Sequence, residues 1–116
     1  MTTKTELLAL AERVEAWGGT EPVFLEDDCR CFGKQYEDQW FAAVLSDSLD
    51  AAKALHDALL PKDRCVLLEQ NFFSWTCHIT EYRDEGPACV GQGTSLTSPA
   101  AAWVAAILRA KAEEIK

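Results

Sequence analysis

Basic residues are scarce in this 116-residue chain: 11 Lys and Arg stand against 19 Asp and Glu, a formal net charge of −8. A surface of that sign repels phosphate backbones and anionic lipids, so direct nucleic-acid binding is not expected. The chain also has no apolar run near the ~18 residues that a bilayer span requires. Its first residues lack the apolar core and cleavage site of a signal peptide. We therefore expect a cytoplasmic protein that does not engage a membrane.

The sequence contains no internal repeat, low-complexity tract or Pro/Ser-rich linker that would divide it. A chain of this length fits one domain, and its 48% apolar content is typical of a folded protein. The five cysteines are an odd number, which favours reduced thiols over a disulfide framework. We expect a single domain over residues 1–116, with an acidic variable segment at 20–47.

Apolar residues at helical spacing predict three main helices, at about residues 4–17, 49–60 and from 99 onward. Each is preceded by a residue whose hydroxyl can cap the helix, namely Thr3, Ser48 and Ser98. The last helix is rich in alanine, which would let it lie close against a sheet.

Strands are predicted between the second and third of these helices. Apolar and polar residues alternate over 75–80, and shorter apolar runs occupy 65–68 and 88–93. Short turns between them favour an antiparallel meander. Gly91 and Gly93 indicate a bulge or a sheet edge in the last strand.

Two further segments complete the predicted fold. The apolar run 40–45 is interpreted as a short strand, and one or two helical turns are expected near 22–31. The sequence thus predicts an α+β fold of the order α-(α)-β-α-β-β-β-α. Its three- to four-stranded, mainly antiparallel sheet would be packed by the three main helices.

The cysteines and histidines do not have the spacing of a zinc site. Structural zinc uses paired ligands, whereas this chain offers one Cys-x-Cys, at residues 29–31, and three isolated cysteines. Cys77 and His78 are neighbours on a predicted strand, so they point to opposite faces. We expect no metal or other cofactor. The three isolated cysteines are predicted to fill the core, one on each strand: Cys65, Cys77 and Cys89.

Motifs of catalysis are missing as well. No nucleophile elbow or glycine-rich oxyanion loop is present. The segment 91–93 resembles a phosphate loop only superficially, because it lacks the lysine of a P-loop. We therefore predict no catalytic residues, and a protein that is not an enzyme.

Acidic residues are concentrated in one part of the chain: residues 21–50 hold eight acids and two bases. A solvated acidic face is the plain interpretation, and the alternative is a docking patch for a protein with a basic surface. The candidate partner-binding residues are Glu21, Glu26, Asp27, Asp28, Glu37, Asp38 and Asp47.

A second hypothesis is a small-molecule or nucleotide-binding module that encloses its ligand as a homo-oligomer. Aromatic and polar side chains in the second half of the chain could line such a pocket. The candidate ligand-binding residues are Phe72, Phe73, Gln92, Thr94 and Ser95. Whether Trp103 belongs to the core or to an interface is left open.

Three stretches resemble small bacteriophage and prophage proteins of the phage ABA-sandwich domain family: residues 7–16, SDSLDAAKAL at 46–55 and TSPAAAWVAAILRAKA at 97–112. Trp75 also lies where such proteins commonly have a strand tryptophan. The resemblance implies an α/β sandwich and a phage or prophage origin, with no established activity. On this basis we expect an accessory protein of the bacterial host cytoplasm. It would act by protein binding, for example as an inhibitor of a host defence complex.

Overall fold

The structure, a computed structural model, describes residues 3–16, 37–60 and 64–114. Four helices and three strands follow in the order α1 (Lys4–Ala16), α2 (Glu37–Leu45), α3 (Leu49–Leu59), β1 (Arg64–Gln70), β2 (Trp75–Arg83), β3 (Gly86–Ser95) and α4 (Pro99–Glu114). The expected α+β class is confirmed. The helix expected near residues 22–31 lies outside the described residues.

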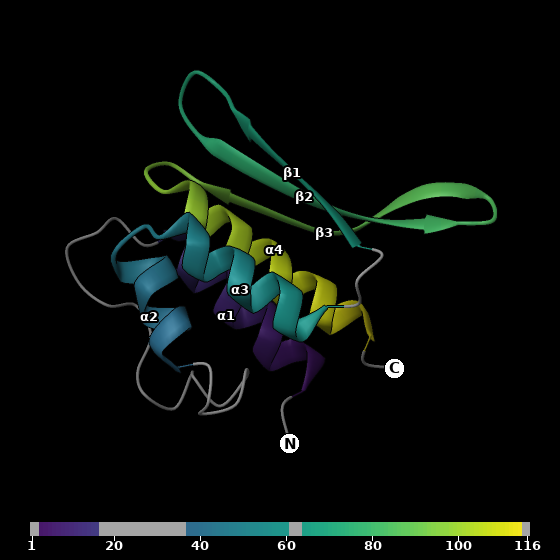
Figure 1. Ribbon diagram of the computed structural model, residues 1–116, viewed down its shortest axis with the longest axis horizontal. Helices are drawn as coiled ribbons and strands as arrows, with labels where there is room; N and C mark the ends of the chain where they lie inside the picture. Colours follow the sequence, from purple (N-terminus) through teal and green to yellow (C-terminus); the bar gives the residue numbers. More distant parts are fainter. Residues whose placement is uncertain (1–2, 17–36, 61–63, 115–116) are drawn as a thin grey trace.

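The three strands form an antiparallel sheet in the order β1-β2-β3, as the meander prediction requires. Val66 lies opposite Ile79, and Ile79 lies opposite Gly91. The register shifts by one residue between Ile79 and Thr80, which confirms the irregularity predicted in β3. Figure 1 shows all helices on one side of the sheet. We call the face toward α4 the inner face and the opposite one the outer face.

The main helices begin at the predicted capping residues. The hydroxyl of Thr3 accepts the Glu6 amide at 3.1 Å, and the hydroxyl of Ser48 accepts the Ala51 amide at 3.1 Å. Ser98 does the same for Ala101 at 3.0 Å. These contacts satisfy amides that a helix leaves unpaired in its first turn.

The strand predicted at 40–45 is wrong, because these residues belong to helix α2. A short run that is apolar at every position has no period, so it does not distinguish a buried strand from a buried helix. The acidic residues before the run favour a helix, since Glu37 and Asp38 fall at the positive end of its dipole. The sheet of the described residues therefore has three strands.

Helix α4 packs so closely on β3 that two positions accept only glycine. A Cβ at Gly93 would collide with the carbonyl oxygen of Ala102, and one at Gly91 with that of Ala106. Eleven residues of α4 are buried, including Trp103, Ile107 and Leu108. Trp103 is thereby placed in the core. The strand glycines and the alanines of α4 together bring helix and sheet into contact.

The prediction for the cysteines holds for only one of them. Cys77 is fully buried, whereas Cys65 and Cys89 are exposed, although each strand carries one. Cys65 of β1 and Cys89 of β3 flank Thr80 of β2 from its two sides, and all three lie on the outer face. No described element covers that face, so a strand cysteine there meets solvent. Burial, with a smaller contribution from Cys89, raises the pKa of the Cys77 thiol to about 12.

Candidate functional site: the β1 edge and its aromatic turn

The two edges of the sheet are built differently, and the edge of β3 is closed by side chains. Glu15 of α1 accepts the Thr94 amide at 2.7 Å, and Arg109 of α4 donates to the Gln92 carbonyl at 2.7 Å. The two side chains also pair with each other at 2.6 Å. Together they occupy backbone groups that would otherwise be open to another strand.

The environment of this pair fixes its charge. Burial raises the pKa of the Glu15 carboxyl, but the bonds from Arg109 and Thr94 outweigh burial, and the net pKa lies below its ordinary value. Glu15 is therefore ionised at neutral pH, and the pair closes the β3 edge as a salt bridge.

Within the described residues, a side chain approaches the edge of β1 at its first residue, where His56 Nε2 lies 3.4 Å from the Arg64 carbonyl oxygen. Among the described residues, no side chain bonds to the backbone of 65–70 on the side away from β2. The strand has the sequence RCVLLEQ, without the lysine or proline that often protects an edge. Leu67 is 54% exposed on the outer face, and Val66 is 39% exposed on the inner face. Over 65–70, the described part of the chain thus leaves both backbone groups and apolar side chains without a covering element.

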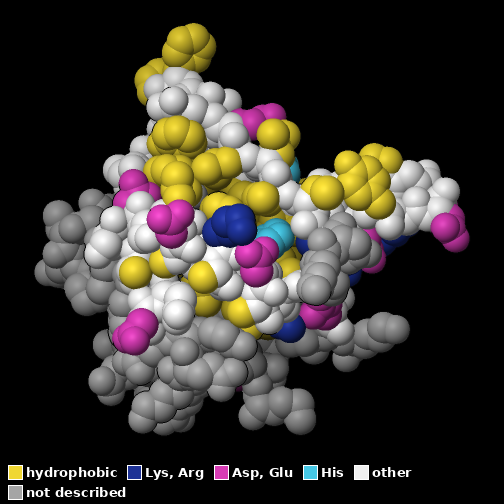
Figure 2. All heavy atoms as spheres, viewed as in Figure 1, with side chains coloured by type: hydrophobic (Ala, Val, Ile, Leu, Met, Phe, Trp, Pro, Cys, Tyr) yellow, Lys and Arg dark blue, Asp and Glu magenta, His cyan; other side chains and the backbone are white. Residues whose placement is uncertain are grey.

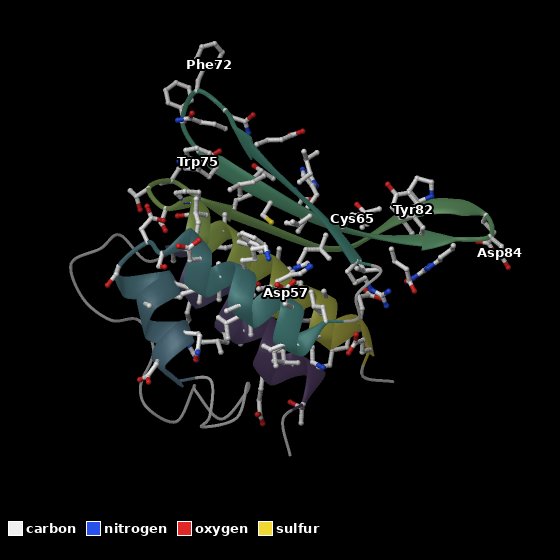
Figure 3. All side chains as sticks on the ribbon, viewed as in Figure 1. Asp57, Cys65, Phe72, Trp75, Tyr82 and Asp84 are labelled. Atoms are coloured by element: carbon white, nitrogen blue, oxygen red, sulfur yellow. The ribbon has the colours of Figure 1, made fainter. Side chains whose placement is uncertain are left out.

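The turn between β1 and β2 adds two phenylalanines. Phe72 is 100% exposed and Phe73 is 86% exposed, with ring centroids 6.5 Å apart. Phe72 stands at the tip of the hairpin, beyond the helices (Figure 3). A shallow depression of about 350 Å³ lies beside it, lined by Gln70, Asn71 and Phe72. We call Phe72 and Phe73 the aromatic turn.

Apolar surface continues from this hairpin toward the helices. Figure 2 shows hydrophobic side chains gathered between the hairpin and the start of α3. Leu49, the first residue of α3, is 43% exposed, and Leu68 and Trp75 are only partly buried against the core. Contiguous apolar surface of this kind marks interaction sites in soluble proteins.

The structure describes only part of the acidic segment. Glu21, Glu26, Asp27 and Asp28 lie outside the described residues, Glu37 begins α2, and Asp38 is exposed. Asp47 accepts hydrogen bonds from the Ser98 hydroxyl at 2.7 Å and the Ala100 amide at 3.1 Å. It holds the start of α4, from a backbone conformation with φ 52°.

The residues of the ligand-binding hypothesis are engaged in different contacts. Phe72 and Phe73 form the exposed turn, whereas the Thr94 hydroxyl and amide both bind Glu15. Ser95 is buried and accepts the amides of Thr97 and Ser98. The Gln92 side chain is exposed. Within the described residues, no single pocket contains these side chains together.

Both histidines have partners in the described structure. His56 is buried: its Nδ1 accepts the Trp103 indole N–H at 3.3 Å, and its Nε2 lies 3.4 Å from the Arg64 carbonyl oxygen. This arrangement joins α3 to α4 and to β1. His78 lies 3.9 Å from the Glu69 carboxylate. No group of three or more His, Cys, Asp or Glu that could hold a metal occurs among the described residues.

Comparison with known proteins found no match among protein-family models, curated proteins or solved structures. None of the described helices is long and apolar enough to cross a membrane. The position of β1 at the edge of the sheet was not predicted from the sequence, where residues 65–68 were interpreted only as a strand. The available signal was position: the first strand of a three-stranded meander is necessarily an edge.

Proposed function

We propose that this protein acts by binding another protein, and that the aromatic turn is its anchor. The observation that carries the proposal is the complete exposure of Phe72 next to the largely exposed Phe73. Leaving two such rings in water forgoes several kcal/mol of apolar burial, about 1.5–3 for each. Large aromatic side chains are also the residues that most often dominate binding energy at protein interfaces.

The charge of the chain favours a particular kind of partner. With a net charge of −8, the protein attracts basic surfaces and repels anionic lipids and nucleic acids. Glu69, exposed on the strand that leads into the turn, has the same sign. The fitting partner therefore has an apolar pocket for the two rings, with basic residues around it.

The resemblance to small phage and prophage proteins supports a bacterial setting for this binding. In that setting we propose an accessory role, with inhibition of a host defence complex as one form. The acidic residues of the segment 20–47 would supply electrostatic attraction, and the aromatic turn would supply the apolar contact.

The test is affinity capture from a bacterial lysate with three baits: the wild-type chain, F72S/F73S and a control, L96S. Leu96 is 75% exposed and lies in the β3–α4 connection, so its substitution removes a comparable apolar side chain elsewhere. We expect a protein that the wild type and L96S capture equally, and that F72S/F73S captures at least tenfold less. Equal capture by all three baits, or no specific protein with any, would contradict the proposal.

A further inference from the structure

One buried side chain, His56, joins three elements of the fold. It lies in α3 and is 6% exposed, and this helix packs against α4 (Figure 1). Its Nδ1 accepts the indole N–H of Trp103 in α4 at 3.3 Å, and its Nε2 lies 3.4 Å from the carbonyl oxygen of Arg64 in β1. We call the imidazole, the indole and this carbonyl the His56 junction.

The partners of the imidazole determine where its proton lies. An indole nitrogen can only donate a hydrogen bond, and a carbonyl oxygen can only accept one. Nδ1 must therefore keep a free lone pair for the indole, and the proton of the neutral ring belongs on Nε2, where it points at the Arg64 carbonyl. The His56 junction thus requires a neutral imidazole in one of its two tautomers.

Protonation of His56 would remove the acceptor of the Trp103 indole. The added proton goes to Nδ1, which would then face the indole N–H as one donor facing another. Trp103 is only 9% exposed, so its N–H would be left unsatisfied in the interior, beside a buried imidazolium. A cation in the last turn of α3 gains from the helix dipole, but by less than these two effects cost.

We infer that His56 is a pH-sensitive switch in this fold. While it is neutral, it holds α3 to α4 and to β1, and on protonation it releases them. Arg64 begins β1, whereas the aromatic turn follows the other end of that strand. The switch is therefore separate from the aromatic turn and goes beyond the proposed function.

The described charged groups of α3 and of the sheet near His56 occur as pairs of opposite sign. On α3, Lys53 and Asp57 form an exposed salt bridge at 3.1 Å. On the sheet, the Arg64 guanidinium lies 3.3 Å from the Glu81 carboxylate. Neither pair brings a net negative charge that would hold a proton on the imidazole.

The helices that pack against α3 carry their described charges elsewhere in their sequences. Helix α4 brings Trp103 to the junction, and its first charged residue, Arg109, pairs with Glu15 at the β3 edge. Helix α2 has its acids, Glu37 and Asp38, in its first turn, and Asp38 is exposed. The contacts of the imidazole in the described structure are therefore the indole and the carbonyl.

The sign of the pH dependence follows from proton binding. An imidazole in the unfolded chain takes up a proton below about pH 6.5. Binding the same proton breaks the junction of the folded chain, so the unfolded state binds more protons and stability is lost as the pH falls. We expect the folding equilibrium constant of the wild type to fall at least about tenfold between about pH 7.5 and 5.0, a range above the titration of ordinary carboxyls.

The two histidines of the chain provide matched variants. H56Q has no imidazole at the junction, so its folding equilibrium constant should change less than about threefold over this range. H78Q removes the imidazole that lies 3.9 Å from the Glu69 carboxylate, and it should depend on pH as strongly as the wild type. Urea unfolding measures all three chains, and circular dichroism establishes that H56Q is folded. A folded H56Q with the pH dependence of the wild type would overturn the inference.

A measurement on the wild type alone decides the case if H56Q does not fold. The indole N–H of Trp103 gives its own signal in nitrogen-15 NMR spectra, and its position reports the hydrogen bond to His56. Between about pH 7.5 and 5.0 this signal should move or broaden as Nδ1 takes up its proton. The indole signal of Trp75, in β2, should change little in the same spectra. A Trp103 signal that stays constant over this range would overturn the inference.

These outcomes are distinct from those of the capture experiment. H56Q leaves both rings of the aromatic turn in place, so at neutral pH it should capture the same protein as the wild type. F72S/F73S leaves His56 and Trp103 unchanged, so it should keep the pH dependence of the wild type. Either proposal can therefore fail while the other holds.

Discussion

At the scale of single residues, the most informative side chain is Asp47. It was selected from the sequence as one of several acids that could face a basic partner. In the structure its Oδ1 accepts two hydrogen bonds at the start of α4, one from a hydroxyl and one from an amide. Its backbone has φ 52°, a conformation that asparagine and aspartate tolerate better than other side chains do. Geometry, in addition to charge, constrains this position.

A pair of variants distinguishes the two roles of Asp47. D47N keeps an acceptor oxygen and tolerates the positive φ, so it should lower the free energy of unfolding by less than about 0.5 kcal/mol. D47A loses both hydrogen bonds and should cost about 1–2 kcal/mol. Urea unfolding at neutral pH measures both.

Partner capture completes the comparison for Asp47. If its charge serves docking, D47N reduces capture although its stability is nearly unchanged. If D47N were as unstable as D47A, the capping interpretation would be wrong.

At the scale of elements, the closure of the β3 edge depends on pH. Burial raises the pKa of the Glu15 carboxyl. The hydrogen bonds from Arg109 and Thr94 lower it by a larger amount, so the folded-state pKa lies below the ordinary 4.5. A carboxyl with a depressed pKa contributes stability above its unfolded-state pKa. That contribution is lost as the pH falls through the folded-state value.

E15Q should therefore destabilise the protein by about 1–2 kcal/mol at neutral pH, with part of the ion-pair energy screened by solvent. The difference from the wild type should shrink as the pH falls below 4.5, because the wild-type carboxyl then becomes neutral as well. Urea unfolding across this range measures the change. E113Q, at an exposed position of α4, is the control and should show little difference at any pH. A cost for E15Q that is independent of pH would contradict this account.

The elements that could be predicted from the sequence are those with strong local signals. Apolar spacing and capping hydroxyls located α1, α3 and α4, and alternation at 75–80 located β2. Helix α2 was mistaken for a strand because its apolar residues have no period. Exposure of Cys65 and Cys89 could not be foreseen, since it depends on which face of the sheet the helices cover. Phe72 and Phe73 of the candidate site were named from the sequence as ligand-binding candidates, whereas the edge position of β1 was missed because an edge is a property of strand order.

At the scale of the whole molecule, the position of α4 in the chain determines when a core can exist. This helix packs against β3, β2, α1 and α3, yet it is the last of the described elements to leave the ribosome. Glu15 lies 94 residues before Arg109, so the β3 edge stays open during most of translation. Until α4 emerges, the inner face of the sheet lacks the helix that packs against β2 and β3. The interval before α4 docks is therefore the stage at which exposed apolar surface makes the chain most prone to aggregate.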